Sequence, residues 1–129
     1  MIRGVAETDT EFETGEYDLA DFAGELEGER NHDIGTKVLL ENDRVRVWEI
    51  RLEPGDRVPF HWHTTTYLFV CVDGGRLRTR FANGTWFAGE MPAGSTVYSA
   101  LSADDPEIHD LENVGDTTVR FTTVELLDA

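Results

Sequence analysis

The chain has 129 residues, the length of one ordinary domain with a single hydrophobic core. Its formal net charge is -15, with 26 acidic against 11 basic residues, so most of its surface would repel a nucleic-acid backbone. No stretch approaches the ~20 apolar residues of a membrane span, the N-terminus lacks the apolar run of a signal peptide, and a single cysteine excludes an internal disulfide. These features predict a cytoplasmic protein that binds neither nucleic acid nor a membrane.

The basic residues are unusual, because only Lys37 is a lysine and the others are arginines. An acid-rich surface with little lysine is typical of halophilic proteins, in which dense salt screens the repulsion between like charges. The alternative is an acidic protein from an organism whose GC-rich genome favours arginine. We expect the halophilic origin.

Residues 1–35 form an acidic N-terminal arm in which apolar residues are widely spaced. Leu19, Phe22 and Leu26 would share one face of a short helix, which Gly24 and Gly28 weaken. We expect a partly ordered arm that lies against the body or against a second subunit; a solvated acidic tail is the alternative.

Residues 36–129 form the domain and consist of short β-like runs separated by turn residues. Asn83-Gly84 is the strongest hairpin signal in the chain. The expected strands are 37–41, 44–52, 61–72, 76–81, 85–91, 95–101, 108–114 and 117–127. With no long helical period, this pattern predicts an all-β antiparallel sandwich.

Two histidines, His61 and His63, open the third run, which we predict to be one continuous strand. Alternate residues of a strand share a face, so both rings should lie on the same side as Tyr67, Phe69 and Cys71. The face would then change from imidazoles at one end to apolar side chains at the other. Cys71 is expected to be a small buried hydrophobic residue.

A third histidine, His109, opens a later strand. Two imidazoles that are two residues apart on a strand can bind one ion at metal–nitrogen distances of ~2.1 Å. A third imidazole from another strand completes a three-histidine site that leaves coordination positions open. We predict a metal site made of His61, His63 and His109. The alternative is a vestigial site whose histidines are structural.

These residues resemble the cupin superfamily. The first signature of the superfamily begins with a glycine, five residues and His-x-His. It continues with three or four residues, a glutamate, six residues and a second glycine. Gly55, His61, His63 and Gly74 match it, and Tyr67 stands at the glutamate position. The second signature is matched by Pro92, Gly94, His109, Asn113 and Gly115. Family members have two residues between that glycine and the histidine, so residues 95–108 are expected to form a longer loop near the site.

The resemblance covers roughly residues 36–127 and implies the cupin fold, a double-stranded β-helix or jelly roll closed into a small barrel. Within the superfamily, the chain resembles the small single-domain cupins labelled as β-alanine degradation proteins of the BauB type. A homodimer is the expected assembly.

A three-histidine site without glutamate resembles that of cupin dioxygenases that act on thiols or diketones with iron. Fe(II) is therefore the expected metal, with Zn, Ni, Mn and Cu as alternatives, and the expected partner is a small organic substrate. Tyr67 would donate a hydrogen bond to a bound ligand; the alternative is a phenolate ligand, which an ordinary phenol pKa of about 10 disfavours.

The expected pocket wall comprises Phe60, Phe69, Phe81 and Tyr98. Arg76, Arg78 and Arg80 alternate along one strand face, which we expect to be exposed to solvent rather than to hold a substrate carboxylate. Two other functions remain open: a metal-dependent isomerase or lyase that needs no oxygen, and a non-catalytic cupin that binds a small molecule.

Overall fold

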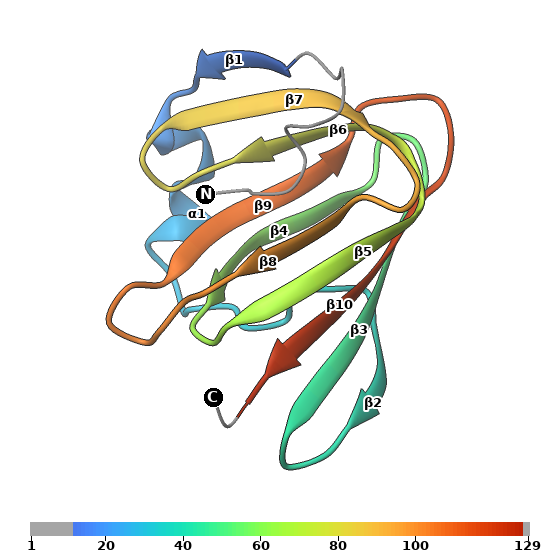
Figure 1. Ribbon diagram of the computed structural model, residues 1–129. Helices are drawn as coiled ribbons and strands as arrows, with labels where there is room; N and C mark the ends of the chain where they lie inside the picture. The colour runs from blue at the N-terminus through green and yellow to red at the C-terminus, as the bar shows by residue number, and fades with distance from the viewer. Residues whose placement is uncertain (1–11, 128–129) are drawn as a thin grey trace.

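Two antiparallel sheets face each other in the computed structural model, which describes residues 12–127 (Figure 1). One sheet has the order β1-β7-β6-β9-β4 and the other β2-β3-β10-β5-β8. The strands are β1 (Phe12–Glu16), β2 (Lys37–Glu41), β3 (Val45–Leu52), β4 (Arg57–His63), β5 (Tyr67–Asp73), β6 (Gly75–Arg80), β7 (Thr85–Met91), β8 (Thr96–Ser99), β9 (Glu107–Asn113) and β10 (Val119–Leu126). The predicted all-β sandwich is confirmed.

The tight turns lie where glycine was expected to form them. Asn83-Gly84 joins β6 to β7, and Gly84 has a φ of +91°, in the left-handed region that glycine enters without steric cost. The Asn83 side chain closes the turn by accepting a hydrogen bond from the Thr85 backbone N–H at 3.0 Å. The hairpin fixes the register of β6 on β7, next to the strand that carries His109.

The third expected strand, 61–72, is two strands in different sheets, which corrects the sequence interpretation. β4 ends at His63 and β5 begins at Tyr67 in the opposite sheet. Thr66 stabilises the reversal, because its hydroxyl donates to the Leu101 carbonyl at 3.4 Å and its own carbonyl accepts from Leu126 at 2.8 Å. These are contacts between distant parts of the chain, which a local sequence pattern does not contain.

Residues 95–108 contain β8 (Thr96–Ser99) within the expected strand 95–101, so they are not the continuous longer loop that the cupin spacing implied. They include β8, which pairs with β5 along Ser99↔Tyr67 and Thr96↔Val70, and the first residues of β9. Only a short turn with a bridge between Ser102 and Asp105 separates the two strands.

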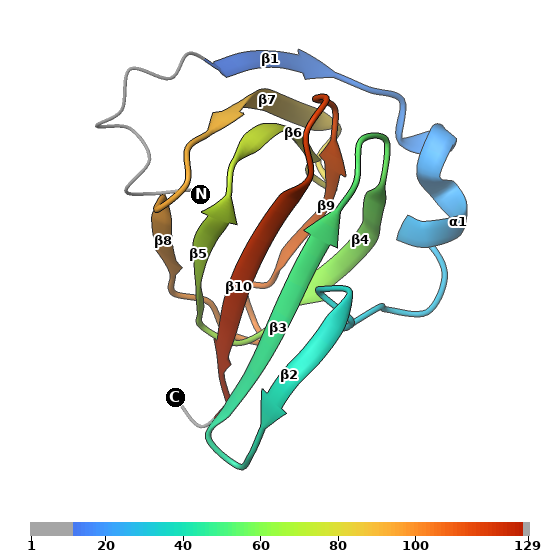
Figure 2. The ribbon, with the colours of Figure 1, turned by 90° about the vertical axis from the view of Figure 1, so that its right-hand side faces the viewer.

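The arm packs on the barrel along the described part of its length. β1 pairs with β7 and extends that sheet, while the 3₁₀ turn η1 (Leu19–Phe22) and helix α1 (Ala23–Leu26) lie outside β4 (Figure 2). The ring of Phe22 meets that of Phe60 edge to face, with centroids 5.4 Å apart. Neither helix is long enough to cross a membrane, and no other helix is present in residues 12–127.

An ion pair fastens α1 to the barrel. The Glu25 carboxylate accepts two hydrogen bonds from the Arg57 guanidinium at 2.8 Å and one from the Phe60 backbone N–H at 2.8 Å. The hydrogen bond from Arg57 lowers the pKa of Glu25 below its ordinary 4.5. Because that pKa is lower in the folded than in the unfolded chain, the contact stabilises the arm above about pH 4.5 and is lost as the pH falls through the lowered value.

We therefore expect Glu25→Gln to loosen the arm at pH 7. Hydrogen exchange of residues 19–26 should accelerate about fivefold, equivalent to a loss of about 1 kcal/mol for a partly exposed ionic hydrogen bond. Exchange in β10 is the internal reference, because it lies in the other sheet. Unchanged exchange of residues 19–26 would show that apolar packing alone holds the arm.

The hydrophobic core fills the barrel at the end away from the histidines. The buried cluster comprises Ile50, Leu52, Val58, Cys71, Leu77, Met91, Val97, Val119 and Phe121. Cys71 is 1% exposed, and burial raises its thiol pKa to about 11, so it is the small hydrophobic residue expected.

Candidate metal centre

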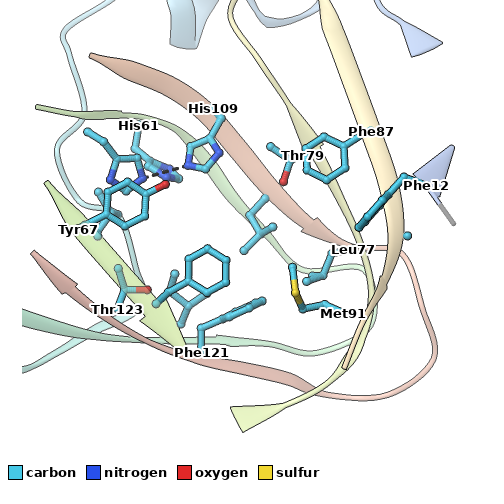
Figure 3. Close-up of a pocket in the computed structure, with 16 residues that line it drawn as sticks. Phe12, His61, Tyr67, Leu77, Thr79, Phe87, Met91, His109, Phe121 and Thr123 are labelled. Atoms are coloured by element: carbon cyan, nitrogen blue, oxygen red, sulfur yellow. Dashed lines mark hydrogen bonds between the residues drawn. The ribbon is translucent and has the colours of Figure 1, made fainter. Parts of the chain in front are cut away.

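Three histidines meet inside the barrel. His61 and His63 extend from β4, and His109 extends from β9 directly opposite His61 in the strand ladder. One ligand atom from each ring lies within 4.8 Å of the others, and the Nε2 atoms of His63 and His109 are 3.0 Å apart (Figure 3). The structure thus brings together the three predicted ligands.

A β-bulge sets this geometry. The ladder between β4 and β9 shifts register between Val58 and His61, where Pro59 has no N–H to donate. An extra residue at such a bulge re-aims the side chains that follow it. The Pro59 carbonyl also lies 2.8 Å from His61 Nδ1. Since a carbonyl only accepts, Nδ1 carries the proton and Nε2 keeps a free lone pair.

Burial keeps the rings neutral. It lowers the pKa of His61 to about 3 and that of His109 to about 4, and lowers the pKa of His63 well below its ordinary 6.5. Neutral imidazole is the form that binds metal, because protonation occupies the lone pair.

The hydrogen bonding of these rings fits a metal ion. Among residues 12–127, neither His63 Nδ1 nor His109 Nδ1 has a hydrogen-bond partner, and the Nε2 atoms of the two rings lie 3.0 Å apart. Without a metal ion, these two neutral Nε2 atoms can lie 3.0 Å apart only if they share a proton in a hydrogen bond. A metal ion can take the place of that proton, because it accepts both lone pairs. The donor set suits Zn, Fe, Ni, Cu or Mn and does not by itself choose among them.

Tyr67 reaches the site from the opposite sheet. Its ring stacks on His63, with centroids 4.1 Å apart and planes 17° apart. Its hydroxyl donates a hydrogen bond to the Glu107 carboxylate. Burial, and then the charge of Glu107, raise the pKa of the phenol above its ordinary 10, so Tyr67 is a protonated donor in this structure.

Glu107 is the site residue that the sequence analysis missed. It is the first residue of β9, lies opposite His63 in the ladder and is 9% exposed. Its Oε1 is 3.8 Å from His109 Nε2. The spacing Glu107-x-His109 repeats the spacing of His61-x-His63, and this signal went unused because the segment was interpreted as a loop.

An apolar cavity of about 60 Å³ extends from the histidines into the barrel. That volume accommodates a few water molecules or a small organic ligand. Its lining comprises Phe12, Ile34, Ile50, His61, His63, Tyr67, Phe69, Leu77, Thr79, Phe87, Gly89, Met91, His109, Leu111, Phe121 and Thr123. Figure 3 shows the imidazoles at one end, with Phe12 and Phe87 at the other.

Of the four residues expected in the pocket wall, only Phe69 lines this cavity. Phe60 precedes His61 and therefore points to the outside of the sheet, where Phe22 and Tyr17 cover it. Tyr98 is 54% exposed on the outer face of β8.

Phe81 is also absent from the cavity lining. Its ring stacks against the rings of His109 and Phe87, at centroid distances of 5.9 and 5.8 Å. The wall residues not foreseen come mostly from β1, β3, β7 and β10, which the sequence did not associate with the histidines.

The three arginines of β6 lie outside the barrel, as expected, but Arg80 is only 13% exposed rather than open to solvent. Arg80 pairs with Asp110 at 2.8 Å, Arg78 lies over the Trp86 ring at 4.8 Å, and Arg76 pairs with Glu13. No arginine or lysine within residues 12–127 lines the cavity.

Several solved structures share this fold. A cupin domain from Bordetella pertussis Tohama I has a TM-score of 0.61 and 26% identity, covering 77% of this chain and 97% of its own. A conserved protein with a double-stranded β-helix domain from Klebsiella pneumoniae has a TM-score of 0.57 and 16% identity, covering 85% and 87%. A structure of oxalate decarboxylase has a TM-score of 0.55 and 22% identity over 81% of this chain but 29% of that longer one. No protein-family model and no curated protein sequence matches the chain.

Proposed function

Because this chain has the fold of the cupin superfamily, we propose that it binds one divalent metal ion through His61, His63 and His109 and acts as a non-haem dioxygenase of a small organic molecule. The observation that carries the proposal is the position of three neutral imidazoles at one end of an apolar cavity inside the barrel. Fe(II) is the favoured metal. Membership in the BauB-type group, and a cytoplasmic location, stay predictions.

Bound iron would supply Lewis acidity and redox chemistry, and so bring an electron-rich substrate and oxygen together. The residues of the chain prepare the site for this role. Pro59 fixes the tautomer of His61 through its carbonyl, and Tyr67 holds His63 by stacking against it. Phe69, Leu111 and Phe121 line the cavity below with apolar side chains, and a bound substrate that displaced water from it would strengthen the charge interactions within it.

The cavity favours a small, largely apolar substrate that binds through a chelating or thiol group. Its lining carries no arginine or lysine within residues 12–127, so a second carboxylate on the substrate would lack a counterion. We therefore do not extend oxalate decarboxylation, named for one structural neighbour, to this chain. Thiols and diketones with short apolar tails are the first substrates to test.

Oxygen uptake tests the proposal directly. The Fe(II)-loaded protein should consume oxygen with at least one member of a panel of thiols and diketones, and metal-free protein should not. Anaerobic turnover with Zn, Mn or Ni would instead support an isomerase or lyase. Tight ligand binding without turnover under any metal would support a binding protein, and either result would overturn the dioxygenase.

Replacing Tyr67 with phenylalanine should preserve metal stoichiometry and reduce oxygen uptake. The phenol is protonated and donates a hydrogen bond, so its loss removes a polar contact rather than a phenolate ligand. Loss of one positioned donor at an active site typically lowers the rate about 100-fold. Elemental analysis and uptake kinetics of the same sample separate the two effects, and loss of the metal in the variant would contradict this prediction.

The acidic surface should make the protein more stable in salt, as proposed for a halophilic protein. At a net charge of -15, added salt screens the self-repulsion, so the melting temperature should rise steadily from 0.1 to 2 M KCl. A flat response would favour the compositional explanation.

We also propose a homodimer. The outer face of the β2-β3-β10-β5-β8 sheet exposes Leu40, Val72 and Tyr98. Its acids Glu49 and Asp73 are paired with Arg120, so two acidic copies would repel each other less there than across unpaired acids. Light scattering at both salt concentrations tests this assembly, and a monomer at both would exclude it.

A further inference from the structure

We propose that Glu107 is a fourth protein ligand of the metal ion, which supplies from β9 the carboxylate that is absent at Tyr67. The inference rests on the metal site of the proposed function and not on the reaction that the site performs. It changes the chemical character of that site from three neutral ligands to three neutral ligands and one anion.

The strand ladder places Glu107 beside the histidines. Glu107 and His109 are two residues apart on β9, so both side chains leave the strand on the same face, toward the barrel interior. Across the ladder, Glu107 lies opposite His63, as His109 lies opposite His61. The four side chains therefore lie at the corners of a square, with His61 and His63 on β4 facing His109 and Glu107 on β9.

The carboxylate is close to one of the nitrogens that would bind the ion. Oε1 of Glu107 is 3.8 Å from Nε2 of His109, and that nitrogen is 3.0 Å from Nε2 of His63. Ligands that share one ion at ~2.1 Å are roughly 3 to 4 Å apart, so the observed separation already falls in the range of two ligands on one metal. Glu107 is also largely buried, at 9% exposure, and so is removed from the bulk water that would otherwise solvate it.

Tyr67 acts as the positioning residue for this carboxylate. Its hydroxyl donates to Oε1, the same oxygen that approaches His109, and its ring is stacked on His63. A carboxylate oxygen has lone pairs for both a hydrogen bond and a metal. Ligating carboxylates are commonly held by such a donor, which fixes their orientation. The tyrosine at the glutamate position would thus support an acid from the opposite sheet.

The added anion has two consequences. It lowers the net charge of the loaded centre from +2 to +1, and it leaves two open positions in a six-coordinate site instead of three. Two adjacent positions are sufficient for a monodentate substrate and oxygen, or for one chelating substrate.

Cobalt(II) binding tests the assignment without reference to activity. The metal-free wild-type protein, Glu107→Gln and Glu112→Gln would be titrated with Co(II) against a competing chelator, and the visible spectra recorded. Glu112 is the matched control, because it lies on β9 but pairs with Arg80 outside the barrel. We expect Glu107→Gln to bind Co(II) about 100-fold more weakly with an altered spectrum. Glu112→Gln should match the wild-type protein.

The possible outcomes distinguish the assignment of Glu107 as a ligand from the existence of the three-histidine metal centre. Wild-type affinity and an unchanged spectrum in Glu107→Gln would overturn the assignment while leaving the three-histidine centre intact. Absence of Co(II) binding by the wild-type protein would overturn the centre itself, and with it the proposed function. If Glu107→Gln does not fold, as judged by circular dichroism without metal, Glu107→Asp takes its place. The aspartate keeps the negative charge, but its side chain is one methylene shorter and so withdraws the oxygen from the ion. Wild-type Co(II) affinity together with an unchanged spectrum in Glu107→Asp would likewise overturn the assignment.

Discussion

Purified without a metal-affinity column from cells grown in iron-supplemented medium, the protein will carry about one metal ion per chain, and the His61→Ala variant will carry essentially none. His61 holds its position through the hydrogen bond from Nδ1 to the Pro59 carbonyl at 2.8 Å, which directs the free Nε2 lone pair into the site. Removing that ring takes away one of the three histidine ligands, and we expect the remaining donors to bind the ion too weakly to keep it through purification. His109→Ala should have the same result, because it removes the only histidine on β9.

Elemental analysis of the purified variants provides the measurement, and His32→Ala is the control. His32 lies in the arm, where its Nδ1 is 3.2 Å from the Trp62 carbonyl, so it shares residue type with the ligands but not their location. It should retain the wild-type metal content. Full metal content in His61→Ala or His109→Ala would place the ion elsewhere and contradict the proposed centre.

The ligand set was predictable because a strand places alternate residues on one face. His61 and His63 satisfy that rule within β4, and the same rule applies to His109 on β9. The resemblance to cupins supplied the step that local pattern lacks, the pairing of these two strands. The structure confirms the fold and shows the three rings together.

The position of Tyr67 was anticipated for a wrong reason. The sequence analysis placed it on one continuous strand with His63. The intervening Thr64, Thr65 and Thr66 are β-branched and favour extended backbone, so the local sequence does not mark a reversal. The chain instead reverses there and enters the opposite sheet. Tyr67 still meets His63 because both sheets contribute side chains to one shared interior.

Glu107 and the pocket wall show what local pattern leaves out. The segment before His109 contains Asp104, Asp105 and Pro106, which are poor strand formers, so the start of β9 was not evident. Phe60 was expected in the pocket wall, but it does not line the cavity. Its actual cover, Phe22 of the arm, is distant in sequence and could not be inferred from spacing.

Replacing Asp110 with alanine should destabilise the fold by about 3 to 5 kcal/mol, the cost of removing one partner from a buried ionic network. The Asp110 side chain is fully buried behind His109. It accepts hydrogen bonds from Arg57 at 2.7 Å, from the Arg80 guanidinium at 2.8 Å and from the Arg80 backbone N–H at 2.7 Å. Without the carboxylate, two partly buried cations face each other across the sheet that carries the metal ligands. Urea denaturation of the metal-free protein measures the loss.

Asp73→Ala is the matched control, because it also removes an aspartate from an arginine pair. Its oxygen is 2.6 Å from Arg120 Nε, but the aspartate side chain is 51% exposed, so water can replace the lost contact. An exposed pair of this kind contributes about 1 kcal/mol or less. A similar small loss in both variants would mean that Asp110 does not hold the sheet. A large loss in Asp110→Ala alone would mean that the network behind β9 fixes the strand on which His109 and Glu107 depend. In that case the metal centre relies on ion pairs outside the barrel as well as on the side chains within it.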